Sequence, residues 1–522
     1  MGAFHILSNR GDQEPLRKQL VPHALPANTS TLPQHHRQLV VARDVKGKPF
    51  GFLPLLCRLY SLEEVDLRHD LPAEQHAIID AYEVPAVAAE LKDAVAEHGL
   101  ESLHRHHTPG IALIVTQSCN LTCSYCLAKQ GTFGLDVVKM TIPEVTKTIA
   151  SLFATKPDID FIKFFGGEPT LRMDLIEAVC DFVTHKLGKT THFALTTNGT
   201  FPATEHLSLW RQYHVSVSVS IDGPPAIHDA ERKRSDGRGS HRDALAYCQT
   251  LRDSDFPFAA VGVFDERHIK GGMSYLDMIR YLNQFSPLVK VQFLEALGDA
   301  ADHVTDHFDL DEARRQVIEA VDHIMTAVTS DFLDVQHPAW VYDNNLFRFL
   351  YGIMCETARP YEHACTASNL TTVFPSGDLM SCYTLASFDD AQYGTRTTVP
   401  ESVEQRRQEF QNTHTWTYLS SCGASVPWYR GIVGDICVAD MMNSQSKGLE
   451  QSDLYRTFQE TATLRILQWL PAVASEPLLL ARVLHAIEEH RAITGEYTDK
   501  MRKSGNKWHT TERSTTINAQ SD

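Results

Sequence analysis

Three cysteines within eight residues are the feature of this sequence that most clearly suggests chemistry. They are Cys119, Cys123 and Cys126, in "CNLTCSYC", and the next cysteine is Cys180. A structural zinc site uses four ligands, so zinc would need a fourth ligand from a distant part of the chain. Three thiols also cannot all pair as disulfides. A [4Fe–4S] cluster held by only three cysteines instead keeps one iron open to another ligand.

An open iron can be chelated by the amino and carboxylate groups of S-adenosylmethionine (SAM). An electron from the cluster could then cleave the S–C5′ bond and release a 5′-deoxyadenosyl radical. The segment "GGEP" fits this interpretation, because Gly166 and Gly167 let a ligand approach the backbone and could offer their amides to the amino acid part of SAM. Glu168 could orient that loop, and Tyr125 is placed to face the adenine.

The elements that must position these residues follow a regular pattern from residue 111 onward. Short apolar runs rich in β-formers alternate with helical stretches, which predicts parallel strands joined by helices. The predicted strands are 111–116, 160–165, 192–197, 215–221, 259–264 and 289–296. Six such units predict an α/β fold, a partial (β/α)6 barrel rather than a closed eight-stranded one.

Four motifs come directly after the first four predicted strands. They are the cysteine triplet, "GGEP", "NG" at 198–199 and "DGP" at 222–224. The carboxyl ends of barrel strands meet at one rim, where loops build the active site. The sequence therefore predicts that these motifs lie together.

The same motifs, in the same order, resemble the radical SAM superfamily. "CNLTCSYC" has its CxxxCxxC spacing, "FFGGEPTL" is similar to its glycine-rich second-strand motif, and "SVSIDGPPAIHDAERKR" resembles its peptide- and protein-modifying branch. The resemblance covers roughly residues 109–300. It implies that Ser220 and Arg232 contact the ribose or carboxylate of SAM, that Asn198 is a further candidate, and that Phe293 or Leu294 packs on the adenine.

A second group of cysteines lies in a loop-rich stretch, 351–440. "CTASNLTTVFPSGDLMSC" and the later "CGASVPWYRGIVGDIC" resemble parts of SPASM domains, which carry auxiliary [4Fe–4S] clusters, although the middle cysteines of that family are missing. The resemblance implies one auxiliary cluster. Its expected ligands are Cys355, Cys365, Cys382 and Cys437, with Cys422 unassigned. A zinc site or core cysteines remain the alternatives, and the isolated Cys57, Cys180 and Cys248 are expected in the core.

Relatives with such auxiliary domains mostly modify peptides or proteins. Anaerobic sulfatase-maturating enzymes, which form formylglycine, carry an aspartate directly after the cysteine that here is Cys382, but this chain has Tyr383. The resemblance therefore favours a maturase that abstracts hydrogen from a ribosomal precursor peptide and installs a crosslink or similar modification. The formylglycine-forming type and a small-molecule dehydrogenase are the alternatives. Tyr383 and Asp435 are candidate acid/base groups, and flavodoxin or ferredoxin is the expected electron donor.

A non-enzyme alternative is an iron–sulfur redox sensor. The intact SAM motifs argue against it, because a sensor needs no SAM pocket.

Residues 37–103 show a short strand pattern followed by a helical pattern, and we expect a small α+β unit that either binds a leader peptide or caps the barrel. The predicted segments are an N-terminal arm and unit (1–105), the barrel (106–310), a helical connection (311–350), the auxiliary domain (351–445) and C-terminal helices with a disordered tail (446–522).

The net charge and the hydropathy of the chain limit the classes of partner that it can bind. The formal net charge is −17, which argues against nucleic acid because duplex binding needs a basic face. No signal peptide and no apolar run long enough for a membrane span are visible. We therefore expect a cytoplasmic protein without membrane or nucleic-acid partners. The basic run 231–242 opposes the overall charge, and we expect a solvated loop or a site for one small anion there.

Overall fold

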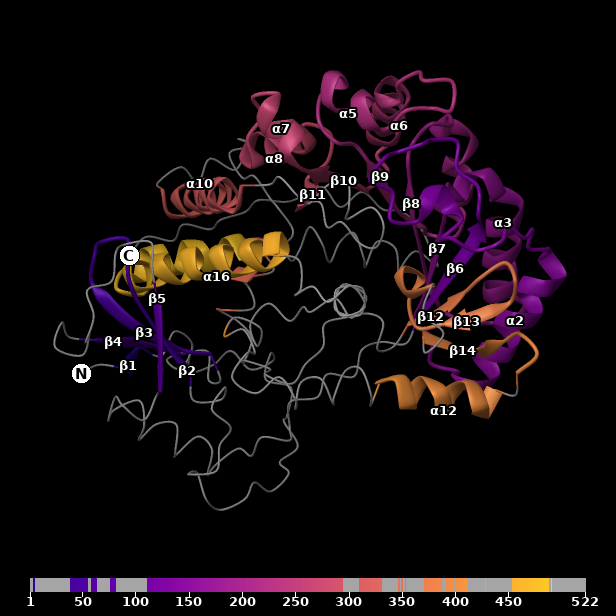
Figure 1. Ribbon diagram of the computed structural model, residues 1–522, viewed down its shortest axis with the longest axis horizontal. Coiled ribbons are helices and arrows are strands. Elements are labelled where there is room, and N and C mark those ends of the chain that lie inside the picture. The colour runs from indigo at the N-terminus through magenta and orange to yellow at the C-terminus, as the bar shows by residue number, and fades with distance from the viewer. Residues whose placement is uncertain are drawn as a thin grey trace, which may run out of the picture.

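The computed structural model contains two sheets, a small N-terminal one at the left of Figure 1 and a larger one at the right. The structure describes residues 38–54, 58–62, 76–80, 110–293, 309–330, 370–386, 391–398, 400–411 and 453–487, together with residues 3–4, 346–347, 349–350, 353, 428 and 490.

Six parallel strands form the partial barrel, which confirms the predicted α/β fold. They are β6 (Gly110–Thr116), β7 (Phe161–Gly166), β8 (His192–Thr197), β9 (Ser216–Ser220), β10 (Phe258–Phe264) and β11 (Leu288–Phe293). Neighbouring strands pair in sequence order, in the arrangement β11-β10-β9-β8-β7-β6. Each strand overlaps a predicted one, because β-branched and aromatic runs bounded by turns are strong strand signals.

Helices cover the outer face of these strands. They are α2 (Ile142–Thr155), α3 (Met173–Asp181), α4 (Leu207–Gln212), α5 (Pro225–Glu231), α6 (His241–Asp253), α7 (Glu266–Lys270) and α8 (Tyr275–Asn283). The helix α2 shows why they form: Thr141 and Glu144 make a capping box at its start, and Val145, Ile149 and Phe153 bury one face.

The stretch predicted to be loop-rich contains regular structure, so that prediction is wrong in part. The strands β12 (Leu370–Val373), β13 (Asp378–Met380) and β14 (Gln392–Thr395) and the helix α12 (Pro400–Gln411) lie within it. Strand β12 pairs in parallel with β6, and β13 and β14 follow antiparallel, so one sheet runs from the barrel into this segment. The sequence did not reveal this because β12 pairs with a strand that lies more than 250 residues earlier.

The N-terminal unit is a five-stranded antiparallel sheet. Its strands are β1 (Ala3–Phe4), β2 (Gln38–Arg43), β3 (Pro49–Leu53), β4 (Arg58–Ser61) and β5 (His76–Asp80), in the order β1-β4-β3-β2-β5. The expectation of one short strand followed by helical pattern is wrong for residues 49–80, and the N-terminal arm contributes β1. Residues 81–109 lie outside the described part of the chain.

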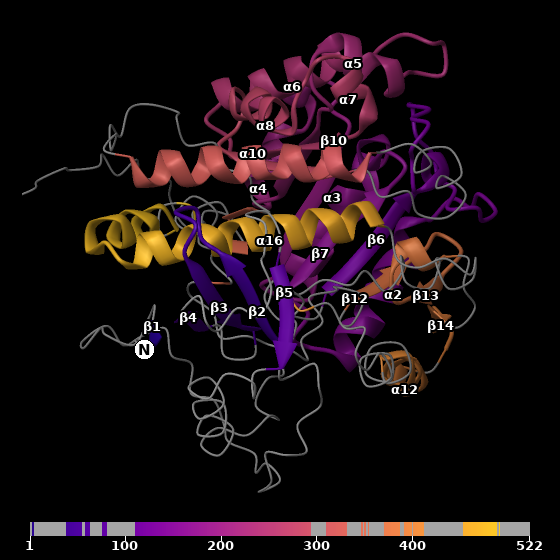
Figure 2. The same ribbon diagram turned by 60° about the vertical axis from the view of Figure 1, so that its left-hand side comes forward.

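Two long helices, α10 (Leu310–Thr329) and α16 (Asp453–Ala474), lie side by side (Figure 2). Arg465 donates to both oxygens of Asp322 at 2.7 and 2.8 Å, and Trp469 donates to the same carboxylate at 2.7 Å. Helix is confirmed over 310–329 and 453–474 of the stretches predicted to be helical. The other predicted segment boundaries remain predictions.

Trp428 ties three parts of the chain together. Its indole N–H donates to His76 of β5 at 3.1 Å and to Glu460 of α16 at 3.2 Å, and its side chain is buried. Nearby, the backbone N–H of Val45 donates to the carbonyl of Gln468 at 3.1 Å. The N-terminal sheet therefore packs on α16. Among the helices that the structure describes, none is long and apolar enough to cross a membrane.

Candidate functional site

The three cysteines lie on the loop that leaves the carboxyl end of β6. The backbone N–H of Leu121 donates to Cys119 Sγ at 3.4 Å, and that of Gln130 donates to Cys126 Sγ at 3.3 Å. All three thiols are half-buried and form no disulfide. Backbone donors aimed at sulfur favour the thiolate, which is the form that binds iron.

Burial raises the pKa of Cys119 to about 11 and the pKa of Cys123 to about 12. Without a cation these thiols stay protonated at neutral pH. A metal cluster would supply the positive charge that holds them as thiolates. Among the described residues, no three His, Cys, Asp or Glu side chains converge on a single ion position. The cysteines of a cluster bind different irons, so the donor set suits a [4Fe–4S] cluster better than one ion.

The two glycines after β7 serve a close approach between loops. A Cβ on Gly166 would lie 2.2 Å from the carbonyl oxygen of Thr116, and one on Gly167 would lie 2.1 Å from that of Ser118. The Gly167 N–H donates to the Thr116 carbonyl at 3.0 Å, and the Glu168 N–H donates to the Ser118 carbonyl at 2.9 Å. The prediction that the Gly167 amide bonds SAM is therefore wrong, because the protein already uses that donor to hold the cysteine loop.

Glu168 is a buried connector. Its Oε1 accepts from the backbone N–H and hydroxyl of Thr170 and from the hydroxyl of Thr197, and its Oε2 accepts the Asn198 N–H at 2.7 Å. Burial raises the pKa of Glu168, and these donors act in the opposite direction. The residue orients its loop, as predicted, by fastening it to the end of β8.

The side chain of Asn198 also forms its hydrogen bonds with other residues of the protein. Its side-chain amide donates to Asn120 Oδ1 at 2.9 Å and lies 3.9 Å from Cys119 Sγ, and its oxygen accepts from Thr200. These contacts place Asn198 beside the cysteine loop. Its predicted contact with SAM stays a prediction.

Tyr125, Asp222 and Arg232 form a buried group beneath the cysteine loop. The Tyr125 hydroxyl donates to Asp222 Oδ2, and Arg232 Nη1 donates to the Tyr125 oxygen at 2.7 Å and lies 3.6 Å from Asp222 Oδ2. Burial, followed by the charge of Asp222, raises the pKa of Tyr125, so the hydroxyl keeps its proton. The predicted contacts of Tyr125 with adenine and of Arg232 with SAM stay predictions. Arg232 Nε is buried and has no hydrogen-bond partner within the described structure.

A chain of hydrogen bonds through two uncharged side chains connects the backbone of Asp222 to the backbone of Arg232. The Asp222 N–H donates to His228 Nδ1 at 3.1 Å, so the proton of this imidazole sits on Nε2. That Nε2–H points to Ser240 Oγ at 3.0 Å, and the Ser240 hydroxyl donates to the Arg232 carbonyl at 2.6 Å. Burial lowers the pKa of His228 to about 4, which keeps the ring neutral.

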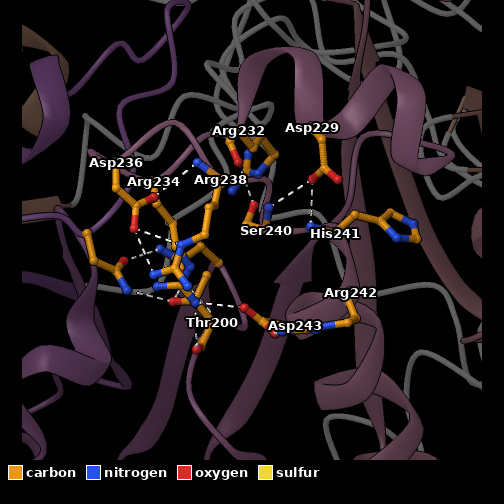
Figure 3. Close-up of polar contacts among 12 residues, drawn as sticks. Thr200, Asp229, Arg232, Arg234, Asp236, Arg238, Ser240, His241, Arg242 and Asp243 are labelled. Atoms are coloured by element: carbon orange, nitrogen blue, oxygen red, sulfur yellow. Dashed lines mark hydrogen bonds and ion pairs between the residues drawn. The ribbon is translucent and has the colours of Figure 1, made fainter.

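The basic run 231–242 forms a structured turn, and most of its residues are exposed, as expected of a solvated loop. Figure 3 shows Asp229 accepting the backbone N–H groups of Ser240 and His241, both at 2.8 Å, and Arg234 reaching Asp243 at 2.7 Å. The Thr122 N–H donates to the Lys233 carbonyl at 2.7 Å. This segment therefore holds the cysteine loop at Leu121 and Thr122.

The described part of the second cysteine group lies against the same loop. Cys382 and Tyr383 follow β13, and the Tyr383 ring stacks on Phe165 with centroids 4.2 Å apart. Tyr383, Phe165 and Cys126 pack on one apolar cluster. Cys355, Cys365, Cys422, Cys437 and Asp435 lie outside the described residues.

The remaining predicted site residues lie in different parts of the structure. Ser220 is half-buried at the end of β9, on the predicted rim. Leu294 lies outside the described residues, and Phe293 packs on Tyr275 at 4.9 Å and on Phe458, so it faces the outer core rather than a ligand. Cys180 and Cys248 are buried, as predicted, and Cys57 lies outside the described residues.

Sequence reasoning missed the roles of Asp222, His228 and Ser240. Asp222 was visible as part of "DGP" after a strand, but Tyr125 lies 97 residues before Asp222 and 107 residues before Arg232 in the chain. His228 and Ser240 carry no sequence signal, because a histidine and a serine near a turn usually face solvent.

Known proteins are similar to this chain in sequence and fold. Residues 113–267 match the family model of the Radical SAM superfamily. GTP 3′,8-cyclase 2 of Mycobacterium bovis is 24% identical over 279 residues, covering 51% of this chain and 72% of that protein. The radical SAM cyclopropyl synthase TigE of Paramaledivibacter caminithermalis is 22% identical over 252 residues, covering 44% of this chain and 51% of that protein. The solved structure of anSMEcpe with bound AdoMet shares the fold with a TM-score of 0.54 and 16% identity, covering 70% of this chain and 99% of that chain.

Proposed function

This chain is a radical SAM enzyme, and from that premise we propose that it matures a ribosomal precursor peptide. In this proposal Cys119, Cys123 and Cys126 hold a [4Fe–4S] cluster. Once bound, the cluster and SAM supply a 5′-deoxyadenosyl radical that abstracts a hydrogen from the peptide. The chain's own residues hold the thiolate loop, order the SAM pocket and exclude water.

One observation carries the peptide assignment. The segment with Cys382 and Tyr383 continues the barrel sheet through β12 and packs on the apolar cluster that includes Cys126. An auxiliary cluster bound through Cys382, with Cys355, Cys365 and Cys437 as further ligands, would then lie close enough to accept the electron that a substrate radical must lose. The fold neighbour anSMEcpe, which is also known with a bound Cp18Cys peptide, supports a peptide substrate.

Tyr383 argues against formylglycine formation. Its ring stacks on Phe165 in an apolar setting, and it supplies no carboxylate next to Cys382. Tyr383 and Asp435 stay candidate acid/base groups. We further propose that the N-terminal sheet β1–β5 and the residues up to 103 bind the leader part of the precursor.

The experiment uses anaerobically reconstituted protein, SAM, a reductant such as reduced flavodoxin, and the peptide encoded by the neighbouring small open reading frame. We expect 5′-deoxyadenosine together with a change in peptide mass or connectivity, and neither product from the Cys123→Ala variant. Formation of 5′-deoxyadenosine with an unchanged peptide would overturn the peptide assignment but not the radical SAM chemistry.

A small-molecule substrate is the second candidate, favoured by the sequence similarity to GTP 3′,8-cyclase 2. The two candidates differ in their need for a leader. Turnover that depends on the N-terminal part of a precursor supports the peptide maturase. Turnover of a small metabolite without any leader supports the alternative.

A further inference from the structure

The large hydrophobic side chains that are exposed on the described structure are concentrated beside the cysteine loop. Five of the seven such side chains belong either to the segment that follows Cys126 or to the one that follows "GGEP". These five, which we call the apolar patch, are Leu127, Val137, Val138, Ile142 and Leu171. Single exposed hydrophobic residues are common on protein surfaces, whereas a group of them marks an interaction site.

Hydrogen bonds hold the segments of the apolar patch next to one another. Gln117, which precedes the cysteines, donates to the carbonyl of Thr132 at 3.3 Å and accepts the N–H of Val138 at 2.9 Å. Arg172, directly after the leucine of the patch, donates to the carbonyl of Met140 at 3.2 Å. The patch is therefore tied to the strand end from which the cysteine loop leaves.

The loop between Cys126 and the two valines of the patch is fixed in an unusual backbone conformation. Gln130 and Phe133 have positive φ angles of 59° and 55°, which residues other than glycine adopt only where the surrounding structure holds them. The buried ring of Phe133 provides this hold, because it packs edge-on against Phe374 at 5.4 Å and against Tyr383 at 6.2 Å between ring centres. A surface that is ordered before a partner arrives loses little entropy when the partner binds.

The charge around the apolar patch differs in sign from the charge of the whole chain. Lys139 and Lys147 are exposed and form no ion pair within the described structure. The nearby acids Glu144 and Asp174 are held by Arg396 at 2.7 Å and by an arginine at 2.8 Å, respectively. Asp136 is then the remaining acid in this segment, so the surface carries a positive charge on a chain of formal net charge −17. Such a surface favours an acidic partner.

The size of the apolar patch indicates the kind of partner. Stable protein–protein interfaces use about 20–30 residues on each side, whereas electron-transfer partners meet through smaller contacts. Leu127 directly follows Cys126, so a protein that docks on the patch comes next to the loop of the three thiols. The methylated ring edge of a flavin is apolar and suits the exposed valine and leucine side chains.

We propose that the apolar patch is the docking surface of a small acidic flavoprotein that supplies the electron for SAM cleavage. This inference rests on the proposed function, in which Cys119, Cys123 and Cys126 hold a [4Fe–4S] cluster. The anionic flavin hydroquinone gives up one electron and becomes the neutral semiquinone, and the cluster accepts that electron and changes from the 2+ to the 1+ state. The residues of the patch bind and orient the flavoprotein for this step.

The first test measures binding without turnover. Oxidised flavodoxin is titrated into the reconstituted protein in a calorimeter, at low and at high salt. Val137→Glu and Lys139→Glu should each weaken the affinity about 10-fold or more, because each places a carboxylate against an acidic partner. Salt should weaken the binding of the natural protein, since it screens the attraction between opposite charges.

Two variants outside the apolar patch are the matched controls. Leu478 is 62% exposed and Val137 is 63% exposed, so Leu478→Glu makes a comparable change on a distant helix. Lys48→Glu reverses the charge of an exposed lysine between β2 and β3. Both controls should keep the affinity of the natural protein. Equal affinity in the patch variants and the controls, or no binding of flavodoxin to the natural protein, would overturn the docking surface.

The second test separates docking from damage to the site. With reduced flavodoxin, the patch variants should form 5′-deoxyadenosine about 10-fold more slowly at subsaturating donor. With dithionite, a small reductant that needs no docking surface, they should match the natural protein in rate and in iron content. An equal loss of rate with both reductants would show that the patch supports the site itself, and it would contradict the proposal.

The remaining outcomes distinguish this proposal from the peptide assignment. Patch-dependent binding of flavodoxin together with 5′-deoxyadenosine and an unchanged precursor peptide supports the docking surface and contradicts the peptide assignment. Patch variants that lose affinity for the precursor peptide but keep their affinity for flavodoxin would assign the patch to the substrate instead. Patch-dependent binding of ferredoxin without binding of flavodoxin would overturn the assignment to a flavoprotein.

Discussion

The Glu168 carboxylate accepts the backbone N–H of Asn198 at 2.7 Å and thereby joins the loops that follow β7 and β8. Both loops touch the cysteine loop, Glu168 through the Ser118 carbonyl and Asn198 through Asn120 and Cys119. The cysteine loop is therefore held by a network of hydrogen bonds from the loops that follow β7 and β8.

Glu168→Gln should loosen this network. All the neighbours of the carboxylate are donors, so a glutamine would place its NH2 group against the N–H of Asn198 or against Thr170 or Thr197. We expect the free energy of unfolding to fall by about 1–3 kcal/mol, measured by denaturant unfolding, with weaker SAM binding. Glu177→Gln, at an exposed position on α3, is the control. An unchanged midpoint for Glu168→Gln would show that the network does not depend on the carboxylate.

Asp222→Asn should leave the guanidinium of Arg232 buried without its anionic partner. The side chains of Arg232 and Asp222 are 11% and 5% exposed, and removing one partner of a buried pair costs about 3–5 kcal/mol. We expect a large loss of stability and a weakened affinity for SAM in calorimetry. Asp243→Asn breaks the more exposed pair with Arg234 in the same segment and should cost about 1 kcal/mol or less. Equal costs for the two variants would contradict a structural role for Asp222.

Cys382→Ala tests the auxiliary cluster. We expect iron to fall from about eight to about four atoms per chain, because one of two [4Fe–4S] clusters is lost. The SAM-binding cluster should remain, so the EPR signal of the reduced protein should still change when SAM is added. Cys422→Ala is the matched control and should keep about eight irons. Iron that stays constant in Cys382→Ala, or that falls equally in Cys422→Ala, would remove Cys382 from the ligand set.

The barrel strands could be predicted because each is a continuous run of apolar β-formers, such as "FIKFFG" and "HFALTT". Their common rim followed from the parallel order alone. The strands β12 and β3–β5 were not predicted, because their partners are set by packing between distant segments and "LTTV" or "RLYS" is too short to show a period.

The site was predictable where one residue type carries the chemistry. The three cysteines were singled out by their spacing, and their role as cluster ligands stays a prediction, whereas the acceptor role of Glu168 follows from its carboxylate. Gly167 was assigned to the wrong partner, because only the structure shows that the Thr116 carbonyl lies 3.0 Å from its N–H. Asp222 and Tyr125 could not be paired from the sequence, since nothing in either segment indicates that the two meet.

Acid should destabilise the fold through His206. This histidine is buried, burial lowers its pKa to about 4, and its Nδ1 lies within hydrogen-bond distance of the Tyr247 hydroxyl, at 3.2 Å. Because the folded-state pKa lies below the unfolded value of about 6.5, protonation favours the unfolded chain. The contribution of neutral His206 to the free energy of unfolding is therefore complete above about pH 6.5, and it is lost as the pH falls toward 4.

The variant His206→Asn removes the titrating group and keeps a hydrogen-bonding group beside Tyr247. We expect it to be less stable than the natural protein near neutral pH, with a gap that narrows by about 1–2 kcal/mol between pH 7.5 and pH 5. Tyr247→Phe leaves His206 buried and should keep the full acid sensitivity, since burial is the cause of the shift. Denaturant unfolding at the two pH values measures the gap. A gap that stays constant would mean that His206 is already protonated in the folded protein or is reached by water.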